Sequence, residues 1–122
     1  MKSRFTNVFV LLVCAVALVM SLPAAAVTNK YPVAHVKHQN SNMVIVVINP
    51  SFFRGSLGDQ NRWFTDIEQC VRSVKLGGQA LVVANDNGRF RFFGPKSWHN
   101  FMQTLDMNWV NARINKSLTC NF

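Results

Sequence analysis

The chain has 122 residues, and its 13 lysines and arginines outnumber its 5 aspartates and glutamates, which gives a formal net charge of +8. The length and the lack of an internal repeat predict a single domain, and the positive charge favours anionic partners. The basic residues are scattered along the sequence, which speaks against a polybasic segment for lipid or nucleic acid.

Residues 1–26 have the order of a secretory signal peptide. Lys2 and Arg4 precede an apolar run at 8–20, and a small-residue cleavage site follows at 24–26. The apolar run is shorter than the roughly 20 residues that a spanning helix needs, so we expect export, not anchoring, and no transmembrane segment after cleavage. Cleavage would leave 11 basic and 5 acidic residues, a net charge of +6.

Two cysteines, Cys70 and Cys120, lie outside the leader. An even pair in a small exported domain predicts a disulfide, and two unpaired thiols are the alternative. The bond would close a loop of about 50 residues and, in the chain-entropy model, contribute about 4 kcal/mol of stability. The sequence has no C-x-x-C motif, so a thioredoxin-type redox role is not supported.

The polar stretch at 27–42 is interpreted as an extended N-terminal arm, and residues 43–122 as the globular domain. The first element of the domain is a β-branched run at 43–48, which is typical of a strand buried on both faces. Pro50 should end this strand, because proline cannot donate to a β-ladder.

A helix is predicted next, with Asp59 as its N-cap. Its apolar residues have helical spacing, and they are Trp63, Ile67, Cys70, Val71 and Val74. The glycine pair at 77–78 should end the helix.

A strand, a tight turn and a return strand are predicted to follow. Residues 79–84 are apolar, Asn-Asp-Asn-Gly at 85–88 is a strong turn signal, and residues 89–93 alternate between arginine and phenylalanine before a final phenylalanine. On the return strand, Phe90 and Phe92 should face the core, and the odd-numbered residues should face the other way.

Two further helical segments are predicted, one from Ser97 and one capped by Asp106. A strand–helix–strand crossover makes the first two strands parallel, and the hairpin adds an antiparallel third. The predicted fold is therefore α+β (α/β-like), in the order β-α-β-β-α. It has a three-stranded mixed sheet with two or three helices packed on it. The three tryptophans lie on apolar stripes and are expected in the core.

Candidate catalytic groups are few. His99 is a weak candidate for acid–base chemistry, and a packing role is more usual for a histidine beside a core tryptophan. His35 and His38 have no helical spacing and no third ligand, so no metal site is predicted. The sequence contains no nucleophile motif and no phosphate-cradling glycine loop, so no cofactor is expected.

The ends of the two predicted parallel strands are the first candidate binding surface. Ligands of open α/β sheets bind outside the carboxyl ends of such strands. The residues expected to converge there are Asn49, Ser51, Phe52, Phe53, Arg54, Asn85 and Asp86. The phenylalanine pair, ringed by polar groups, would anchor a protein partner, and local shielding of the pair is the alternative.

The predicted return strand is the second candidate binding surface. Arg89 and Arg91 form a short basic stripe, and the planar guanidinium suits carboxylates and phosphates. Solvated charges that protect a sheet edge are the alternative. Nucleic acid is a disfavoured ligand, because most aromatic side chains of this strand face away from the arginines.

Together these features predict an exported, periplasmic or extracellular, non-enzymatic binding or accessory protein of an envelope assembly. Its expected partner is another envelope protein. Two alternatives stay open. One is a small secreted, nuclease-like hydrolase or toxin that uses His99 with Arg89 or Arg91, and the other is a binder of anionic cell-surface polymer or lipid head groups.

Overall fold

The polar segment that precedes the β-branched run at 43–48 forms a strand of the sheet. In the computed structural model, which describes residues 28–121, β1 (Thr28–His38) pairs with β2 (Ser41–Val47) on one side and with β5 (Lys116–Asn121) on the other. The prediction of an arm at 27–42 is therefore wrong for the described part of that range. Buried Tyr31 and Val33 face one side of the sheet and alternate with exposed Lys30 and Pro32, whereas Ala34 is buried on the other side.

The sheet has five strands, not the predicted three, in the order β4-β3-β2-β1-β5. The predicted arrangement of three of these strands is confirmed. Strand β3 (Gln79–Asp86) runs parallel to β2, and β4 (Arg89–Phe93) pairs antiparallel with β3. Both additional strands, β1 and β5, come from segments whose polar composition concealed the strand pattern. The domain is thus a small α+β fold with a mixed sheet.

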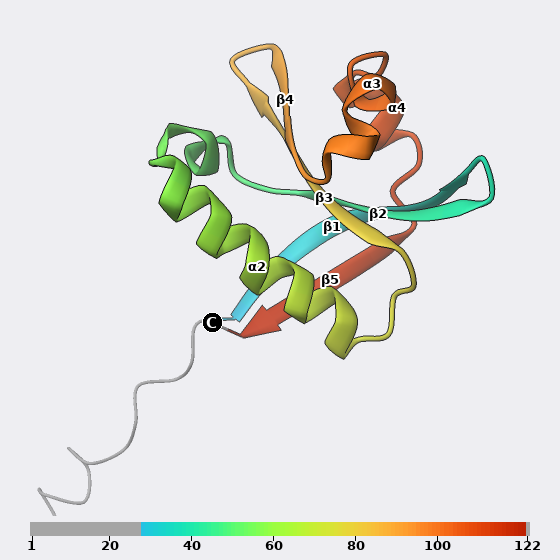
Figure 1. Cartoon of the computed structure of the whole chain (residues 1–122), viewed down its shortest axis with the longest axis horizontal. Helices are drawn as coiled ribbons and strands as arrows, with labels where there is room; N and C mark the ends of the chain where they lie inside the picture. Colours follow the sequence, from blue (N-terminus) through green and yellow to red (C-terminus); the bar gives the residue numbers. More distant parts are fainter. Residues whose placement is uncertain (1–27, 122) are drawn as a thin grey trace, which may run out of the picture.

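Helices cover both faces of the sheet (Figure 1). The short 3-10 helix η1 (Pro50–Arg54) leads into α2 (Leu57–Ser73) on one face. On the opposite face lie the 3-10 helix η2 (Lys96–Trp98), α3 (His99–Met102) and α4 (Met107–Asn111).

The caps of α2 and α4 follow from side-chain hydrogen bonds at their first turns. Ser56, not the predicted Asp59, caps α2, because its Oγ accepts from the backbone N–H of Asp59 at 3.2 Å. Asp106 caps α4 as predicted, and its carboxylate accepts from the backbone N–H of Trp109 at 2.8 Å.

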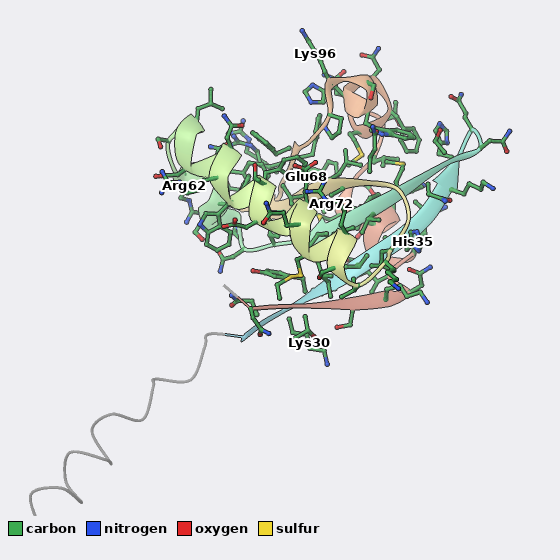
Figure 2. All side chains as sticks on the ribbon, turned by 60° about the horizontal axis from the view of Figure 1, so that its bottom comes forward. Lys30, His35, Arg62, Glu68, Arg72 and Lys96 are labelled. Carbon is green, nitrogen blue, oxygen red and sulfur yellow. A yellow bond between two sulfur atoms is a disulfide. The ribbon has the colours of Figure 1, made fainter. Side chains whose placement is uncertain are left out.

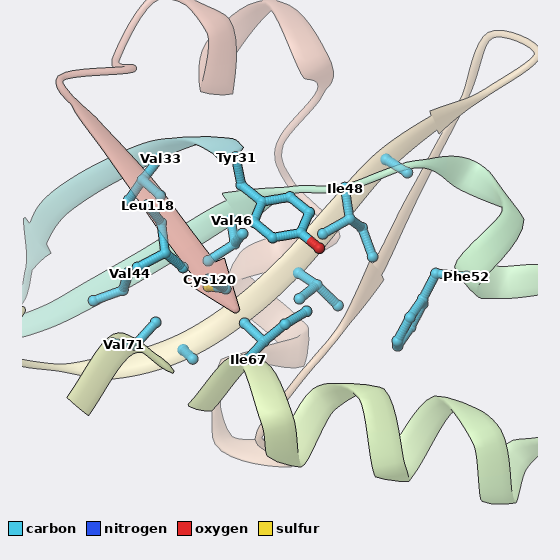
Figure 3. Close-up of a cluster of buried hydrophobic side chains, with 13 residues drawn as sticks. Tyr31, Val33, Val44, Val46, Ile48, Phe52, Ile67, Val71, Leu118 and Cys120 are labelled. Atoms are coloured by element: carbon cyan, nitrogen blue, oxygen red, sulfur yellow. The ribbon is translucent and has the colours of Figure 1, made fainter. Parts of the chain in front are cut away.

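Two clusters of buried side chains hold these layers together. The α2-face cluster (Figure 3) consists of Tyr31, Val33, Val44, Val46, Ile48, Phe52, Ile67, Val71, Ala80, Val82, Ala84, Leu118 and Cys120. The α3–α4-face cluster consists of Ala34, Met43, Ile45, Leu81, Val83, Met102 and Val110.

The tryptophans are only partly where the sequence predicted them. Trp98 and Trp109 pack against the α3–α4-face cluster. Trp63 was expected in the core but is 46% exposed. Phe64, its neighbour on α2, packs against the α2-face cluster instead, so the buried stripe of the helix is rotated from the predicted one.

Cys70 on α2 and Cys120 on β5 lie at disulfide distance, as predicted, with their sulfur atoms 2.07 Å apart. This bond ties the helix to the last strand across a sequence separation of 50 residues. The predicted signal peptide, residues 1–26, lies outside the described residues. Within residues 28–121 the structure contains no helix with the length and apolar character to cross a membrane.

Candidate functional site

A groove opens where β2 leaves β1. The pairing of these strands begins at His38↔Ser41 and ends at Val33↔Val46, because the next residue of β1 is Pro32, which has no N–H to donate. The chain then turns toward β3, and the backbone N–H of Ile48 donates to a β3 carbonyl at 2.9 Å. The first half of β1 thus loses its neighbour on this side.

The segments around this opening enclose a groove of about 550 Å³, which we call the β1–α2 groove. Its lining residues come from β1, from η1 with its flanks, and from α2. They are Asn29, Tyr31, Asn49, Ser51, Phe52, Gly55, Asp59, Arg62, Trp63 and Asp66. The volume falls in the range of about 300–1,000 Å³ that is usual for ligand sites.

The groove is slightly acidic in a basic protein. Arg62 pairs with Asp59 at 3.3 Å, although both side chains are largely exposed, so this pair adds little stability. Asp66 also lines the groove, which gives its three charged residues a formal charge of −1. A cationic side chain would therefore be favoured here over an anionic one.

At Lys30, the backbone N–H and C=O of β1 point to the side of the strand that β2 has left. His35 exchanges both of its backbone hydrogen bonds with the side chain of Asn115, on the β5 side, at 2.8 and 2.9 Å. Backbone direction alternates along a strand, so Lys30 turns its N–H and C=O to the opposite side, where β2 has departed. Figure 2 shows the side chain of Lys30 extending away from α2.

Tyr31 forms the apolar wall of the groove on β1. Tyr31 is only 9% exposed, and Figure 3 shows its ring beside Val46 and Ile48. Burial raises the pKa of its hydroxyl above the ordinary value of 10.0, because the charged phenolate is disfavoured away from water.

Part of the predicted strand-end surface does converge. Arg54 of η1 contacts the carboxylate of Asp86, at the end of β3, at 2.9 Å, and Arg91 of β4 approaches the same carboxylate at 3.8 Å. The guanidinium of Arg91 also lies over the ring of Phe53, 5.2 Å from its centroid. These side chains satisfy one another and hold η1 against the β3–β4 hairpin.

The remaining predicted binding residues have separate surroundings. The carboxamide of Asn49 accepts from the N–H of Ser51 at 2.9 Å and so caps η1, and Asn85 accepts from the N–H of Gly88 in the hairpin turn at 2.8 Å. Arg89 is exposed beside that turn. Of the nine predicted binding residues, three line the β1–α2 groove: Asn49, Ser51 and Phe52.

The structure does not bring His99 and Arg91 together. His99 contacts Phe92, which packs against the α3–α4-face cluster, with ring centroids 5.5 Å apart. Arg91 lies on the other face of β4, over Phe53. His99 and Arg91 therefore lie on opposite faces of β4, the edge strand of the sheet.

The ring nitrogens of two histidines have backbone partners. Nε2 of His35 is 2.8 Å from the carbonyl oxygen of Gly77, and Nε2 of His99 is 3.0 Å from that of Gly94. His38 stacks on Phe101, with ring centroids 3.8 Å apart. No group of three or more potential metal ligands occurs among residues 28–121.

Sequence reasoning missed most of the groove. The sequence interpretation places Asn29 and Tyr31 in the arm and Trp63 in the core, so the β1 and α2 sides of the groove are not predicted. The signal available in the sequence was the apolar pair at 31 and 33 with Pro32 between them, a residue that breaks one β-ladder only.

Comparisons of the chain with protein-family models, with curated proteins and with solved structures found no match.

Proposed function

We propose that the chain is an exported, non-enzymatic binding protein of an envelope assembly, and that the β1–α2 groove holds an extended segment of a partner protein. The observation that carries this proposal is the one-sided pairing of β1 before Pro32, beside a groove with apolar and polar walls. An unpaired strand edge next to a groove suits strand addition, in which backbone hydrogen bonds give affinity and side-chain pockets give specificity.

The walls of the groove suit a peptide of a particular character. Tyr31 and Phe52 offer apolar surface to one side chain of an extended segment, and partly exposed Trp63 lies beside Phe52, with ring centroids 6.5 Å apart. Asp66 would attract a lysine or arginine of the partner. The expected ligand is therefore an extended segment that carries an apolar and a basic side chain.

The surroundings of the histidines support a binding role over a catalytic one. The rings of His35 and His99 each contact a backbone carbonyl, that of Gly77 and that of Gly94, so both have a structural role. Arg91, one of the two cations named for the hydrolase alternative, approaches the carboxylate of Asp86 at 3.8 Å and lies over the ring of Phe53, so it has contacts within the protein.

Replacement of Lys30 by proline tests strand addition directly. Because the N–H of Lys30 faces the side that β2 has left, Lys30→Pro removes a donor that a partner needs and that the sheet does not use. The matched control, Lys30→Ala, removes the same side chain and keeps the donor. Each tagged protein would be incubated with an envelope extract of the source organism, washed at high salt and analysed by mass spectrometry.

We expect the unaltered protein and Lys30→Ala to retain one stoichiometric partner that Lys30→Pro loses. Circular dichroism of Lys30→Pro should match that of the control, so that lost binding is not lost folding. Equal retention by a folded Lys30→Pro protein would contradict strand addition. Recovery of anionic polymer alone, released at high salt, would overturn the proposal and direct attention to Arg89.

A further inference from the structure

A second groove lies at the opposite end of the sheet, between the β1–β2 hairpin, the start of β3 and η2. It has a volume of about 520 Å³, and we call it the Trp98 groove. Its lining residues are Gln39, Ser41, Asn42, Gly78, Gln79, Ser97 and Trp98. We propose that this groove binds a neutral carbohydrate.

The chemistry of the lining carries the inference. Five of the seven residues bear an uncharged amide or hydroxyl, and none of the seven bears a charge. Amides and hydroxyls both donate and accept hydrogen bonds, as the hydroxyl groups of a sugar do. An acidic ligand would find no cation in this lining, although the chain as a whole has a net charge of +8.

Trp98 supplies the apolar element that a sugar site needs. One face of a pyranose ring presents C–H groups, and these pack well on the electron-rich face of an indole. The indole N–H of Trp98 donates to the side-chain oxygen of Gln79, which fixes the ring and leaves the amide nitrogen of Gln79 as a donor. Trp98 also contacts Phe101 and His38, each with ring centroids 6.1 Å from its own, and these contacts help to hold the indole in place.

The polar side chains of the groove remain available to a ligand. Among the described residues, Gln79 is the single member of the five whose side chain makes a hydrogen bond. The other four, Gln39, Ser41, Asn42 and Ser97, are exposed. Exposed amides and hydroxyls with free bonding capacity can exchange water for sugar hydroxyls at little cost.

The backbone of the groove is shaped to present these groups. Gln39 and Asn40 form the hairpin turn with φ values of 50° and 62°, a conformation in which a glutamine is unusual. Gly78 has a φ of 122°, and a Cβ there would lie 2.5 Å from the carbonyl oxygen of Asn42. Glycine therefore lets the start of β3 approach the start of β2 and close the floor of the groove.

An extended peptide fits this groove less well than a sugar. The start of β2 is paired with β1 through Ser41↔His38 and with β3 through Met43↔Gln79, so it offers no free strand edge. This contrasts with the β1–α2 groove, and the inference does not depend on the function proposed for that groove.

The test is a titration of the purified protein with three probes, followed by amide chemical shifts in NMR. Triacetylchitotriose and maltotriose are neutral, and trigalacturonate is an acidic trimer of similar size. We expect at least one neutral trimer to bind at millimolar concentration and to shift amides at 39–42, 78–79 and 97–98. Trigalacturonate should bind no more tightly than the neutral probes at any salt concentration.

Variants separate the sugar site from general packing. Trp98→Ala should weaken binding about tenfold, the loss expected for one aromatic contact. Because Trp98 also packs on the core, Gln39→Ala provides an independent test and should weaken binding about fivefold without affecting the fold. Gln103→Ala removes an exposed amide outside the groove and is the matched control, with unchanged binding.

Three results with the neutral trimers would overturn the proposal. They are the absence of any shift with both neutral trimers, shifts confined to the β1–α2 groove, and binding that Gln39→Ala leaves unchanged in the folded protein. Tight, salt-sensitive binding of trigalacturonate alone would also contradict it, because it would indicate an anion site elsewhere.

Discussion

The two faces of the sheet are covered in different ways. On one face a single 17-residue helix, α2, packs over a continuous cluster and is joined to β5 through Cys70 and Cys120. On the other face α3 has four residues and α4 has five. Aromatic contacts join these short helices, such as that between Phe101 and Trp109, whose ring centroids are 5.9 Å apart. Isolated helices shorter than about 12–15 residues are marginal in water, so the second layer depends on its side chains for order.

We infer from this difference that the α3–α4 face opens more easily than the α2 face, which has a long capped helix and a covalent tie. The Trp98 groove takes its aromatic side chain from the α3–α4 face. The β1–α2 groove is lined in part by α2.

Loss of the disulfide should have the largest effect, because it breaks the tie that distinguishes the α2 face. The double variant Cys70→Ser, Cys120→Ser should lose about 4 kcal/mol of unfolding free energy, since the unfolded chain is no longer constrained. Urea denaturation followed by circular dichroism measures this loss. A loss below about 1 kcal/mol would mean that packing alone holds α2 in place.

A matched pair of core truncations should sharpen the comparison. Ile67→Ala and Met102→Ala each remove a fully buried side chain, one from each face. The cost of such changes runs from about 2 to 5 kcal/mol and is lowest where the surroundings can close around the cavity. In urea denaturation we expect Met102→Ala to lie near the lower limit and Ile67→Ala about 1 kcal/mol above it, which is still less than the loss expected for the disulfide. Equal costs, or the reverse order, would contradict the difference between the faces.

The smallest effect should come from the hydroxyl of Tyr31 on the α2 face. Burial raises its pKa in the folded protein above 10.0, the unfolded value. Its contribution to stability is therefore complete below pH 10 and is lost as the pH rises through the folded pKa. Tyr31→Phe should not show this loss.

Tyr31 is the one tyrosine of the chain, so tyrosinate absorbance during an alkaline titration reports this residue alone. The midpoint should lie above pH 10, provided that circular dichroism shows the protein still folded there. A midpoint at or below that pH would mean that water reaches the ring freely. The α2 face would then be less tightly closed at the groove than its buried cluster indicates.

The elements with strong local signals were predictable, and those with weak ones were not. Local sequence indicates β2 and β3 by their apolar runs and the β3–β4 hairpin by its Asn-Gly turn. Asp106 likewise indicates the start of α4. Strands β1 and β5 each bury few side chains, and both sequences contain many polar residues. Their pairing partners lie far apart along the chain, which no local pattern reveals.

The candidate sites were predictable to a smaller extent. The sequence predicted Arg54 and Asp86 at the strand ends and Arg91 on a separate basic stripe, but it could not show that both arginines approach the carboxylate of Asp86. It missed the β1–α2 groove because a groove arises from where two strands part. The pairing of β1 with β2 ends at Pro32, while the pairing of β1 with β5 continues past it. This difference can be recognised only when both neighbours of β1 are known.

The pairing of β1 with β5 has a consequence for the order of assembly. The first described strand meets the last one, with Thr28 opposite Asn121, and without β5 the first half of β1 has no partner in the sheet. A chain that emerges from the ribosome with its N-terminus first cannot complete this sheet until residues 116–121 have emerged. Long-range closure of this kind slows folding. The topology thus leaves one side of β1 unpaired during synthesis until β5 is available.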